Sequence, residues 1–354
     1  MKRNPPSELS GIKEIARRAN VSIATVDRVI HKRTGVSIKT RDKINKIITD
    51  LDYQPNLLAR RLASRKTYRI ATLIPKIGGE SSFWEAPLSG IKQAESELRQ
   101  LGIYIEKIFF DQEDNTSFVK QSRQVLKNKP DGILLAPSFV NEAIEFTNLC
   151  KQQQIPYVFI NSDIPEQKSL CYIGPDLYRS GYLAGNLISY LVDDHHEILI
   201  VNVTKKLEDR HHLIRKEEGL KAYFKDHNRN NAIKTLDILQ FDPQSIELSL
   251  SAALQQNANI RVLFVTNSRV AAVANYLKQF PNQILLVGYD FLKENIDYLN
   301  EGVIDFLICQ KPVEQAYRGV MSLYQHLVLS ATVEDIYFMP IDIITKENYA
   351  YYRN

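Results

Sequence analysis

From residue 68 onward, short apolar runs rich in β-branched and aromatic residues alternate with amphipathic stretches of helical period. The runs read RIATLIP, IYIEKIFF, DGILLAP, IPYVFIN, EILIVNV, IRVLFVTN, QILLVGYD and VIDFLICQ. Nearly continuous apolar strands separated by helices are typical of parallel sheets covered on both faces. About ten strands exceed what one sheet holds comfortably. The sequence therefore predicts an α/β body of two similar lobes, each a doubly wound parallel sheet.

The first 69 residues have a different composition from the rest of the chain. They hold 17 Lys and Arg against 6 Asp and Glu, a net charge of +11. The whole chain has a net charge of +4, so the remaining residues carry −7. A small, strongly basic head on a mildly acidic body indicates a nucleic-acid-binding module attached to a second functional unit.

The sequence of the head contains start and stop signals for three short helices. Apolar residues at helical spacing predict a helix from Gly11 to Ala19, followed by a tight turn at Asn20. Ser22 suits the N-cap of a second helix and Ser37 that of a third. We expect a small all-α helix-turn-helix, whose second helix enters the major groove of DNA.

The outward face of that second helix is the candidate DNA-reading surface. If its apolar side chains pack on the first helix, helical spacing turns five residues outward together, with Ser22 and Thr25 flanking them. Those five are Ile23, Ala24, Asp27, Arg28 and His31. The alternative is an ordinary solvent-facing helix on a basic domain.

Several function classes do not fit the sequence. The polar N-terminus MKRNPPSELS has no apolar core typical of a secretory signal, and no apolar run reaches the ~20 residues of a membrane span. Three scattered cysteines favour a reducing compartment, so we expect a cytoplasmic protein with no membrane partner. The histidine pairs at 195–196 and 211–212 are expected to be solvated and not metal ligands. Without a nucleophile motif or phosphate loop, we expect neither catalysis nor a cofactor.

The head reads IKEIARRANVSIATVDRVIHKRTGVSIKTRDKINKIITDLDYQPNLLARRLASRKT from residue 12. This stretch resembles the DNA-binding domain of the LacI family of bacterial transcription regulators. That family has the pattern GVS-x-x-TVSRV, then VS-x-x-T-R, then Gly-Tyr-x-Pro-Asn and A-x-x-L. The matching residues are Ala16, Val21, Ser22, Thr25, Val26, Arg28, Val29, Val36, Ser37, Thr40, Arg41, Tyr53, Pro55, Asn56, Ala59 and Leu62. The resemblance continues over the α/β body. It implies a helix-turn-helix domain at 10–54, a hinge helix and linker at 55–67, and a two-lobed effector-binding and dimerisation domain at 68–354.

The resemblance implies roles for individual residues of the head. Ile23, Ala24 and Arg28 stand where the family reads bases, and Arg28 suits bidentate contact with guanine. Leu57 to Ala63 resembles the hinge helix, whose leucine, here Leu62, enters the minor groove. The DNA-binding set also includes Asn56, Ala59 and Arg60 beside it, with His31.

Asp27 departs from the family, which usually has serine there. A carboxylate at this position is repelled by phosphates unless something compensates. It could accept a hydrogen bond from cytosine N4, or pair with Arg28, Arg17 or Arg18. We favour the base contact.

The body resembles periplasmic sugar-binding proteins, which hold a ligand between two lobes at the carboxyl ends of the strands. Polar residues just after strands are therefore the ligand candidates: Asp163, Asn267, Asp290 and Gln310. Asp163 could instead cap the next helix. Phe83 and Trp84 follow the first strand, where they could stack on a sugar ring or simply pack in a loop.

Two further positions depend on the resemblance. The family places an arginine three residues before a glycine at a helix start, and here that slot holds Lys216 with Arg215 one residue earlier. We favour Arg215, since its planar fork can bind two hydroxyls. Asp176 could contact ligand or a hinge strand.

Together these features predict a ligand-responsive, LacI-type transcriptional regulator. It would bind a pseudo-palindromic operator in double-stranded DNA as a homodimer, as a repressor in preference to an activator, and sense a small sugar or sugar derivative between its lobes. The alternative is a cytoplasmic sugar-binding or sugar-processing protein with an incidental basic head.

Overall fold

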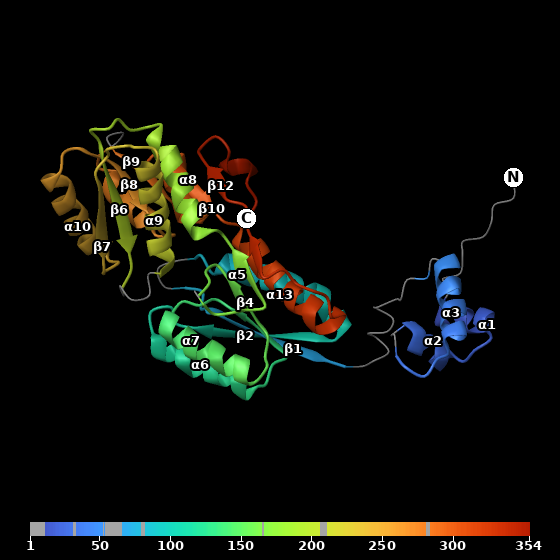
Figure 1. The fold of residues 1–354 in the computed structure, drawn as a ribbon. Coiled ribbons are helices and arrows are strands. Elements are labelled where there is room, and N and C mark those ends of the chain that lie inside the picture. The colour runs from blue at the N-terminus through green and yellow to red at the C-terminus, as the bar shows by residue number, and fades with distance from the viewer. Residues whose placement is uncertain are drawn as a thin grey trace. The chain divides into compact units, whose positions relative to one another are not determined.

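The computed structural model describes residues 11–30, 33–51, 53, 66–78, 82–164, 166–205, 211–280 and 284–354. The chain divides into two compact units, Met1–Ser64 and Arg65–Asn354 (Figure 1). We call the first the head and the second the body. The predicted hinge helix Leu57–Ala63 lies outside the described residues, as do His31, Asn56, Ala59, Arg60 and Leu62.

The described part of the head contains three helices, α1 (Ile12–Ala19), α2 (Ile23–Ile30) and α3 (Ile38–Asp50). Helix α1 ends at Asn20, whose left-handed backbone (φ 54°) turns the chain sharply. The hydroxyl of Ser22 accepts a hydrogen bond from the Thr25 backbone at 3.1 Å, and that of Ser37 from Thr40 at 3.2 Å. The helices enclose a small apolar core of Ile15, Ala16, Ala19, Val26, Val29 and Ile44. The predicted helix-turn-helix is confirmed.

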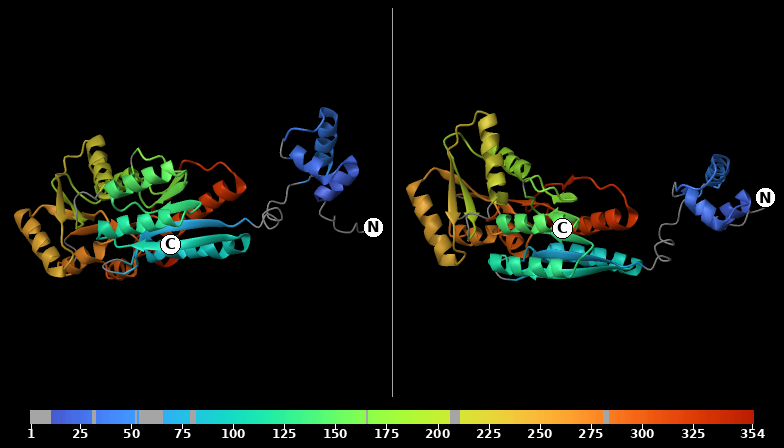
Figure 2. Two further views of the ribbon diagram at one scale, coloured as in Figure 1. Left: turned by 90° about the horizontal axis from the view of Figure 1, so that it is seen from below. Right: turned by 60° about the horizontal axis from the view of Figure 1, so that its bottom comes forward.

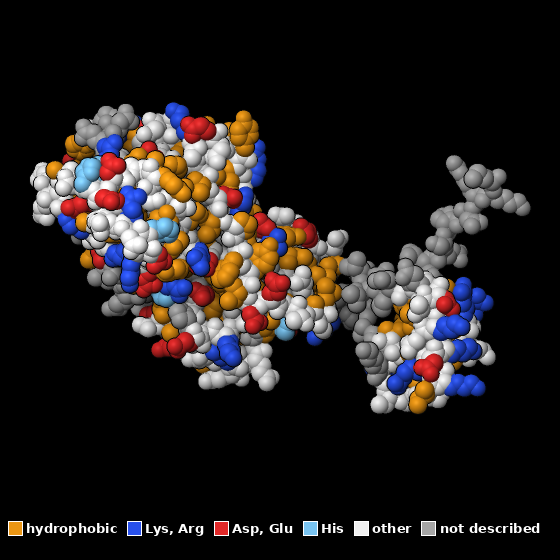
Figure 3. Space-filling view, turned by 45° about the horizontal axis from the view of Figure 1, so that its top comes forward, with side chains coloured by type: hydrophobic (Ala, Val, Ile, Leu, Met, Phe, Trp, Pro, Cys, Tyr) orange, Lys and Arg blue, Asp and Glu red, His pale blue; other side chains and the backbone are white. Residues whose placement is uncertain are grey.

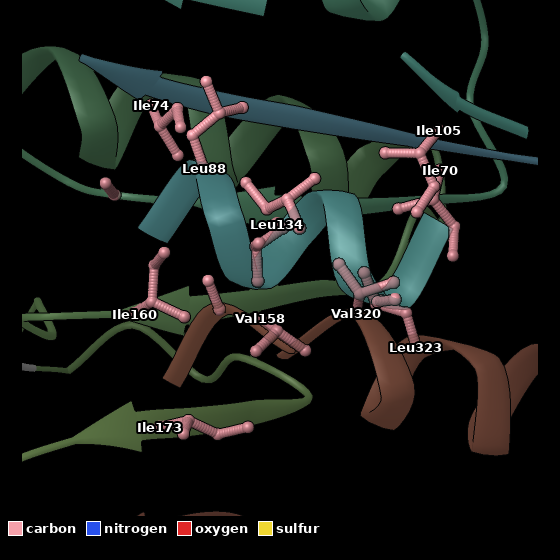
Figure 4. Close-up of a cluster of buried hydrophobic side chains, with 14 of the residues drawn as sticks. Ile70, Ile74, Leu88, Ile105, Leu134, Val158, Ile160, Ile173, Val320 and Leu323 are labelled. Atoms are coloured by element: carbon pink, nitrogen blue, oxygen red, sulfur yellow. The ribbon is translucent and has the colours of Figure 1, made fainter. Parts of the chain in front are cut away.

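Lobe 1 of the body is a six-stranded sheet in the order β11-β5-β4-β3-β1-β2. Its strands are β1 (Tyr68–Pro75), β2 (Ile103–Phe110), β3 (Gly132–Leu135), β4 (Tyr157–Ile160), β5 (Cys171–Gly174) and β11 (Ile336–Phe338). Helices α5 (Glu85–Leu98) and α13 (Pro312–Leu329) cover one face, while α6 (Asn115–Lys127) and α7 (Val140–Gln152) cover the other. A short 3₁₀ turn, η1 (Arg99–Leu101), follows α5. Figure 4 shows Leu88 of α5 and Val320 of α13 near Leu134 and Val158 of the sheet.

Lobe 2 repeats this plan in the order β12-β10-β9-β8-β6-β7. Its strands are β6 (Glu197–Val203), β7 (Ile233–Ile238), β8 (Ile260–Val265), β9 (Leu285–Tyr289), β10 (Phe306–Cys309) and β12 (Asp342–Ile344). Helices α8 (Leu177–Ser189) and α9 (His211–Asp226) lie on one face, and α10 (Pro243–Gln256), α11 (Val270–Leu277) and α12 (Lys293–Asn300) on the other (Figure 2). The 3₁₀ turn η2 (Tyr349–Tyr351) is near the C-terminus. Two doubly wound lobes are thus confirmed, with β12 antiparallel to β10.

The chain crosses between the lobes three times, after β5, after β10 and after β11. The first crossing leads into α8, which packs unusually closely on α9. A Cβ on Gly181 of α8 would lie 1.9 Å from the carbonyl oxygen of Lys216, and one on Gly219 of α9 would lie 2.0 Å from that of Tyr178. Because only glycine permits this approach, the two residues fix the position of α9 beside the sheet.

Candidate functional site

Helix α2 of the head presents the face that its sequence pattern predicts. Val26 and Val29 are buried, whereas Ser22, Ala24 and Arg28 are exposed. Ile23 is 48% exposed, although a large aliphatic side chain is usually buried in so small a domain. Figure 3 shows Lys and Arg side chains on the surface of the head. An exposed apolar group beside an exposed arginine is suited to a surface that reads thymine methyls and guanine.

Asp27 is half-buried on this helix and forms an ion pair with Arg33, at 3.2 Å between Oδ2 and Nη1. Pairing with Arg17 or Arg18 does not agree with the structure. Both arginines bond the carboxylate of Glu14, at 2.7 Å and 2.8 Å. Hydrogen bonds from Arg17 and then Arg18 lower the pKa of Glu14 to about 2. Arg33 lies beyond the C-terminal end of α2, so helical spacing did not suggest it as a partner of Asp27.

Two adjoining cavities lie between the lobes of the body, and we call them together the cleft. They share Trp84, Gln112, Asn161, His212, Asn267 and Arg269 as lining residues. Residues that follow β1, β2, β3 and β4 form the wall on lobe 1, and residues that follow β6, β7, β8, β9 and β10 contribute to the wall on lobe 2. The carboxyl ends of parallel strands are where this architecture binds ligands.

The aromatic pair Phe83 and Trp84 forms the apolar floor of the cleft. Their rings meet edge to face at 5.1 Å between centroids, and both side chains are buried. The indole Nε1–H of Trp84 donates to Oε1 of Gln112 at 3.1 Å, which fixes the ring's orientation. Leu292, from lobe 2, joins the same apolar cluster. The rings pack in the core, as one of the two readings predicts, and they also line the cleft. Stacking on a sugar ring stays a prediction.

A buried cation and carboxylate lie at the other end of the cleft. The Lys216 ammonium donates to the carbonyl oxygen of Thr266 at 2.8 Å and lies 3.6 Å from the centre of the Tyr289 ring. Asp290 accepts a hydrogen bond from Nε2 of Gln310 at 3.2 Å. Burial lowers the pKa of Lys216 and raises that of Asp290, while each charge opposes the shift of the other.

Amide side chains hold the loops that carry these groups. Asn295 donates from Nδ2 to the carbonyl oxygens of Ser268, Tyr289 and Asp290, at 3.0–3.2 Å, and accepts from the backbone of Ala271. The backbone of Asp290 is left-handed (φ 75°), a conformation that costs free energy outside glycine. Asn267 bonds the Val203 carbonyl at 2.8 Å. These hydrogen bonds fix the loops that carry the polar groups of the cleft.

The structure brings together most of the predicted effector residues. Phe83, Trp84, Lys216, Asn267, Asp290 and Gln310 all line the cleft. Arg215, which we favoured over Lys216, is not among the lining residues. Asp163 and Asp176 do not line it either.

Those three residues lie around a different group. The charges of Asp163, Asp176 and Arg215 all act on the buried phenol of Tyr172, whose pKa is raised, chiefly by burial. Asp176 also caps α8, since Oδ1 accepts from the Arg179 backbone at 2.9 Å. No helix begins directly after Asp163 within the described residues, so the capping role suggested for it is wrong.

Several lining residues were missed by sequence reasoning. Arg269 follows β8, Lys205 follows β6, and Gln112 and Glu113 follow β2, so the rule that singled out Asn267 would have found them. Phe241 follows β7, an exposed edge strand. The sequence of β7 lacks the continuous apolar run by which the other strands of the body were recognised, so Phe241 was missed. His212 also lines the cleft, and burial lowers its pKa, so the expectation that it is solvated is wrong.

Within the described residues, one group has the composition of a metal site. It consists of Asp193, His195 and His196, with the first two exposed. Nδ1 of His196 already accepts a hydrogen bond from the Asp193 backbone at 3.1 Å, which leaves only the other ring nitrogen available. None of the described helices has the length and apolar character that crossing a membrane requires.

Comparison with known proteins matches both units. Residues 11–56 match the family model of bacterial regulatory proteins of the lacI family, and residues 70–329 match that of periplasmic binding protein domains. One similar protein is the HTH-type transcriptional regulator MalR of Streptococcus pneumoniae. It is 25% identical over 293 residues, 81% of this chain and 85% of MalR.

Three further comparisons bear on family and fold. Catabolite control protein A of Staphylococcus xylosus is 30% identical over 147 residues, so the match spans 42% of this chain and 42% of that protein. A crystal structure assigned as a LacI transcriptional regulator from Bacteroides fragilis superposes with a TM-score of 0.74 at 29% identity, covering 81% of this chain and all of that one. GanP, a glucose-galactose binding protein from Geobacillus stearothermophilus, shares the fold (TM-score 0.71, 22% identity, 80% of this chain and 99% of that one).

Proposed function

Because the chain belongs to the LacI family of bacterial regulatory proteins and carries a periplasmic binding protein domain, we propose that it is a ligand-responsive transcriptional regulator. It binds a pseudo-palindromic operator as a homodimer, in the cytoplasm, and senses a small carbohydrate-like effector in the cleft. One observation supports the proposal most strongly. The same chain has an exposed face on α2 that suits contact with bases, and a cleft between the two lobes of its body.

On DNA, helix α2 lies in the major groove. The Arg28 guanidinium donates two hydrogen bonds to O6 and N7 of guanine, and Ile23 and Ala24 contact thymine methyls. Ser22 and Thr25 bond the phosphates at the start of the helix. His31 extends this face, while Asn56, Ala59, Arg60 and Leu62 act from the hinge segment. These last five lie outside the described residues, and their roles depend on the family pattern.

In the cleft, polar groups converge on one side and aromatic rings on the other. Trp84 and Phe83 pack against the C–H face of a sugar ring, and Asp290, Gln310 and Asn267 take its hydroxyls. The fold is shared with a glucose-galactose binding protein, which also favours a carbohydrate. The positive charge of Lys216 favours the charged form of Asp290. Asp163, Asp176 and Arg215 support the wall through Tyr172 and do not contact the ligand.

Regulation follows from the difference in affinity between two arrangements of the lobes. An effector that contacts both walls binds the closed arrangement better, and it shifts the population by that difference. Closure changes the separation of the two hinge segments in the dimer, so operator affinity changes with it. We propose repression as the resting activity.

An electrophoretic mobility shift assay with genomic fragments tests the proposal. We expect sequence-selective retardation by the full chain, lost in Arg28→Ala while the melting temperature stays unchanged. Lys127→Ala, a charge change on α6 of the body, serves as the matched control and should retard DNA as the parent does. If no fragment is selectively retarded with or without candidate sugars, the chain is a sugar-binding protein with an incidental basic head.

A further inference from the structure

One residue of lobe 2 belongs to the apolar core of lobe 1. Leu292 follows β9, a strand of lobe 2, yet its side chain is 6% exposed and packs in the cluster that contains Phe83, Trp84 and Leu88. The other buried members of that cluster, within the described residues, come from lobe 1 or from the crossing after β11. Leu292 therefore links the two lobes through buried apolar surface.

The backbone around Leu292 holds its side chain in that position. The preceding residue, Phe291, packs against the apolar cluster of lobe 2, and its ring centroid lies 4.7 Å from that of Tyr352. Leu292 itself is extended (φ −101°, ψ 151°), a conformation in which successive side chains point to opposite sides. Its N–H donates to the carbonyl oxygen of Asp290 at 3.1 Å. The segment is therefore anchored in lobe 2 while Leu292 reaches lobe 1.

The same segment carries a proposed ligand group. Asp290 lies two residues before Leu292 and lines the cleft, and its carbonyl oxygen also accepts from Nδ2 of Asn295 at 3.0 Å. On the facing wall, Trp84 lines the cleft and lies in the cluster that Leu292 enters. A ligand that bridges Asp290 and Trp84 therefore requires the same approach of the lobes that buries Leu292.

The polar contacts between the same two walls are weaker. The Ser82 hydroxyl donates to the Glu294 carboxylate at 3.4 Å, near the limit of a hydrogen bond. Lys205 and Glu113 form an ion pair whose side chains are 44% and 36% exposed, so water screens it. Burial of an aliphatic side chain is favourable without a partner of matching charge. Of these contacts, we expect the burial of Leu292 to contribute most to holding the lobes together.

We propose that Leu292 is a positioning residue that favours the closed arrangement of the lobes before any effector binds, and so sets how much effector is needed to change operator binding. This inference rests on the proposed effector role of the cleft. The apparent affinity of a ligand for one arrangement scales with the fraction of the chain already in that arrangement. Loss of the Leu292 side chain therefore lowers effector affinity, although Leu292 is not among the residues that line the cleft.

A cross-linking experiment measures the approach of the lobes without any effector. The full chain carries Ser82→Cys and Glu294→Cys, one thiol on each lobe, and reacts with an excess of a short bis-maleimide. One linker joins the two thiols when the lobes are together, and each thiol takes its own linker when they are apart. The intact mass gives the ratio of bridged to doubly modified chain. The natural cysteines, Cys150, Cys171 and Cys309, are buried and should react slowly.

We expect Leu292→Ala to lower that ratio about tenfold, since it removes most of the buried apolar surface of the side chain. Leu292→Met, which has an apolar side chain of similar volume, should keep the ratio within about twofold of the parent. The matched control is Leu299→Ala, which removes the same atoms from a buried side chain of α12 whose cluster lies within lobe 2. That control should leave the ratio unchanged even though it lowers the melting temperature.

Three results would overturn the inference. The parent could give no bridged chain, Leu292→Ala could bridge as readily as the parent, or Leu299→Ala could lower the ratio as far as Leu292→Ala does. The third result would mean that any loss of buried surface opens the lobes, so that Leu292 has no particular role in their position.

Operator fragments distinguish failure of this inference from failure of the proposed function. Under the proposed function, the effector-free chain binds operator in the open arrangement, so Leu292→Ala should retard operator fragments at least as well as the parent does. A bridging ratio that depends on Leu292, without selective retardation of DNA, would reject the regulator and keep the positioning role. Selective retardation with a ratio that does not depend on Leu292 would reject the positioning role and keep the regulator.

Discussion

Each unit of the molecule has a carboxylate and a cation that act on each other at the face we propose for binding, and the two pairs differ in contact and in burial. Asp27 and Arg33 form an ion pair, whereas Lys216 acts on Asp290 through its charge without direct contact. In the head, Asp27 and Arg33 are 39% and 61% exposed. In the body, Lys216 and Asp290 are 4% and 6% exposed. Water screens the first pair and is excluded from the second. The exposed pair can exchange partners when DNA approaches, whereas the buried pair is a fixed part of the fold.

The largest effect in this comparison should come from breaking the buried pair. Lys216→Met leaves the Asp290 carboxyl and the Thr266 carbonyl buried without their cation. We expect a loss of about 3–5 kcal/mol in the free energy of unfolding at pH 8, measured by urea denaturation. Lys216→Met with Asp290→Asn should recover most of the loss, because no unpaired charge remains.

The loss of unfolding free energy in Lys216→Met should depend on pH, and the protonation of Asp290 decides whether it grows or shrinks as pH rises. Burial raises the pKa of Asp290 in the folded chain above its unfolded value, and removing Lys216 raises it further. The folded variant therefore holds a proton that the unfolded chain releases, so its stability falls as pH rises above the unfolded pKa. Lys216→Met should be less destabilised at pH 5 than at pH 8. A loss equal at both pH values would mean that Asp290 is not the cause.

An intermediate effect should follow from Gln310→Ala, which keeps both charges and removes one hydrogen bond. The buried Asp290 carboxylate loses its amide donor, at a cost of about 1–3 kcal/mol in unfolding free energy. The same urea titration measures it. A loss greater than that of Lys216→Met would show that the amide, and not the cation, is the main support of Asp290.

The smallest effect on stability should come from Asp27→Ser in the head. Losing an exposed ion pair costs less than about 1 kcal/mol, but operator preference should change, because a carboxylate on α2 can accept from cytosine N4. Mobility shifts with an operator series substituted at each base pair measure the change. An unchanged preference at every position would exclude the base contact.

Arg33→Ala removes the other half of the ion pair and shows whether Asp27 acts on DNA directly or through Arg33. If Asp27 contacts a base directly, Arg33→Ala should weaken binding evenly across the operator series. If Asp27 acts by positioning Arg33, both variants should change the same base position.

The fold was predictable from sequence because each unit has a strong local pattern. Ile12, Ile15 and Ala19 recur at helical spacing in α1, as Val26 and Val29 do in α2, and the strands contain continuous apolar runs such as ILIV in β6. Strand β7 was not recognised, since it lies at an exposed edge and buries few of its residues. Phe241, which follows it, was missed for the same reason.

The cleft was predictable where a residue directly follows a buried strand, as Asn267, Asp290 and Gln310 do. The choice between Arg215 and Lys216 was not, because neighbouring residues of a helix differ by about 100° in direction. Their orientation depends on how α9 rotates against α8, and that is set by the close contacts at Gly181 and Gly219. A pattern within one helix does not contain this information.

The three crossings between the lobes have a consequence for synthesis on the ribosome. Helix α13 and strand β11 complete lobe 1, yet they emerge only after the strands β6 to β10 of lobe 2. At ordinary elongation rates, the apolar face of lobe 1 that awaits α13 stays uncovered for roughly 10–30 s. Lobe 2 lacks only its edge strand β12 at that stage. The lobe translated first therefore waits until almost the end of synthesis for its covering helix, and a nascent chain halted before residue 312 would expose that face to chaperones and to aggregation.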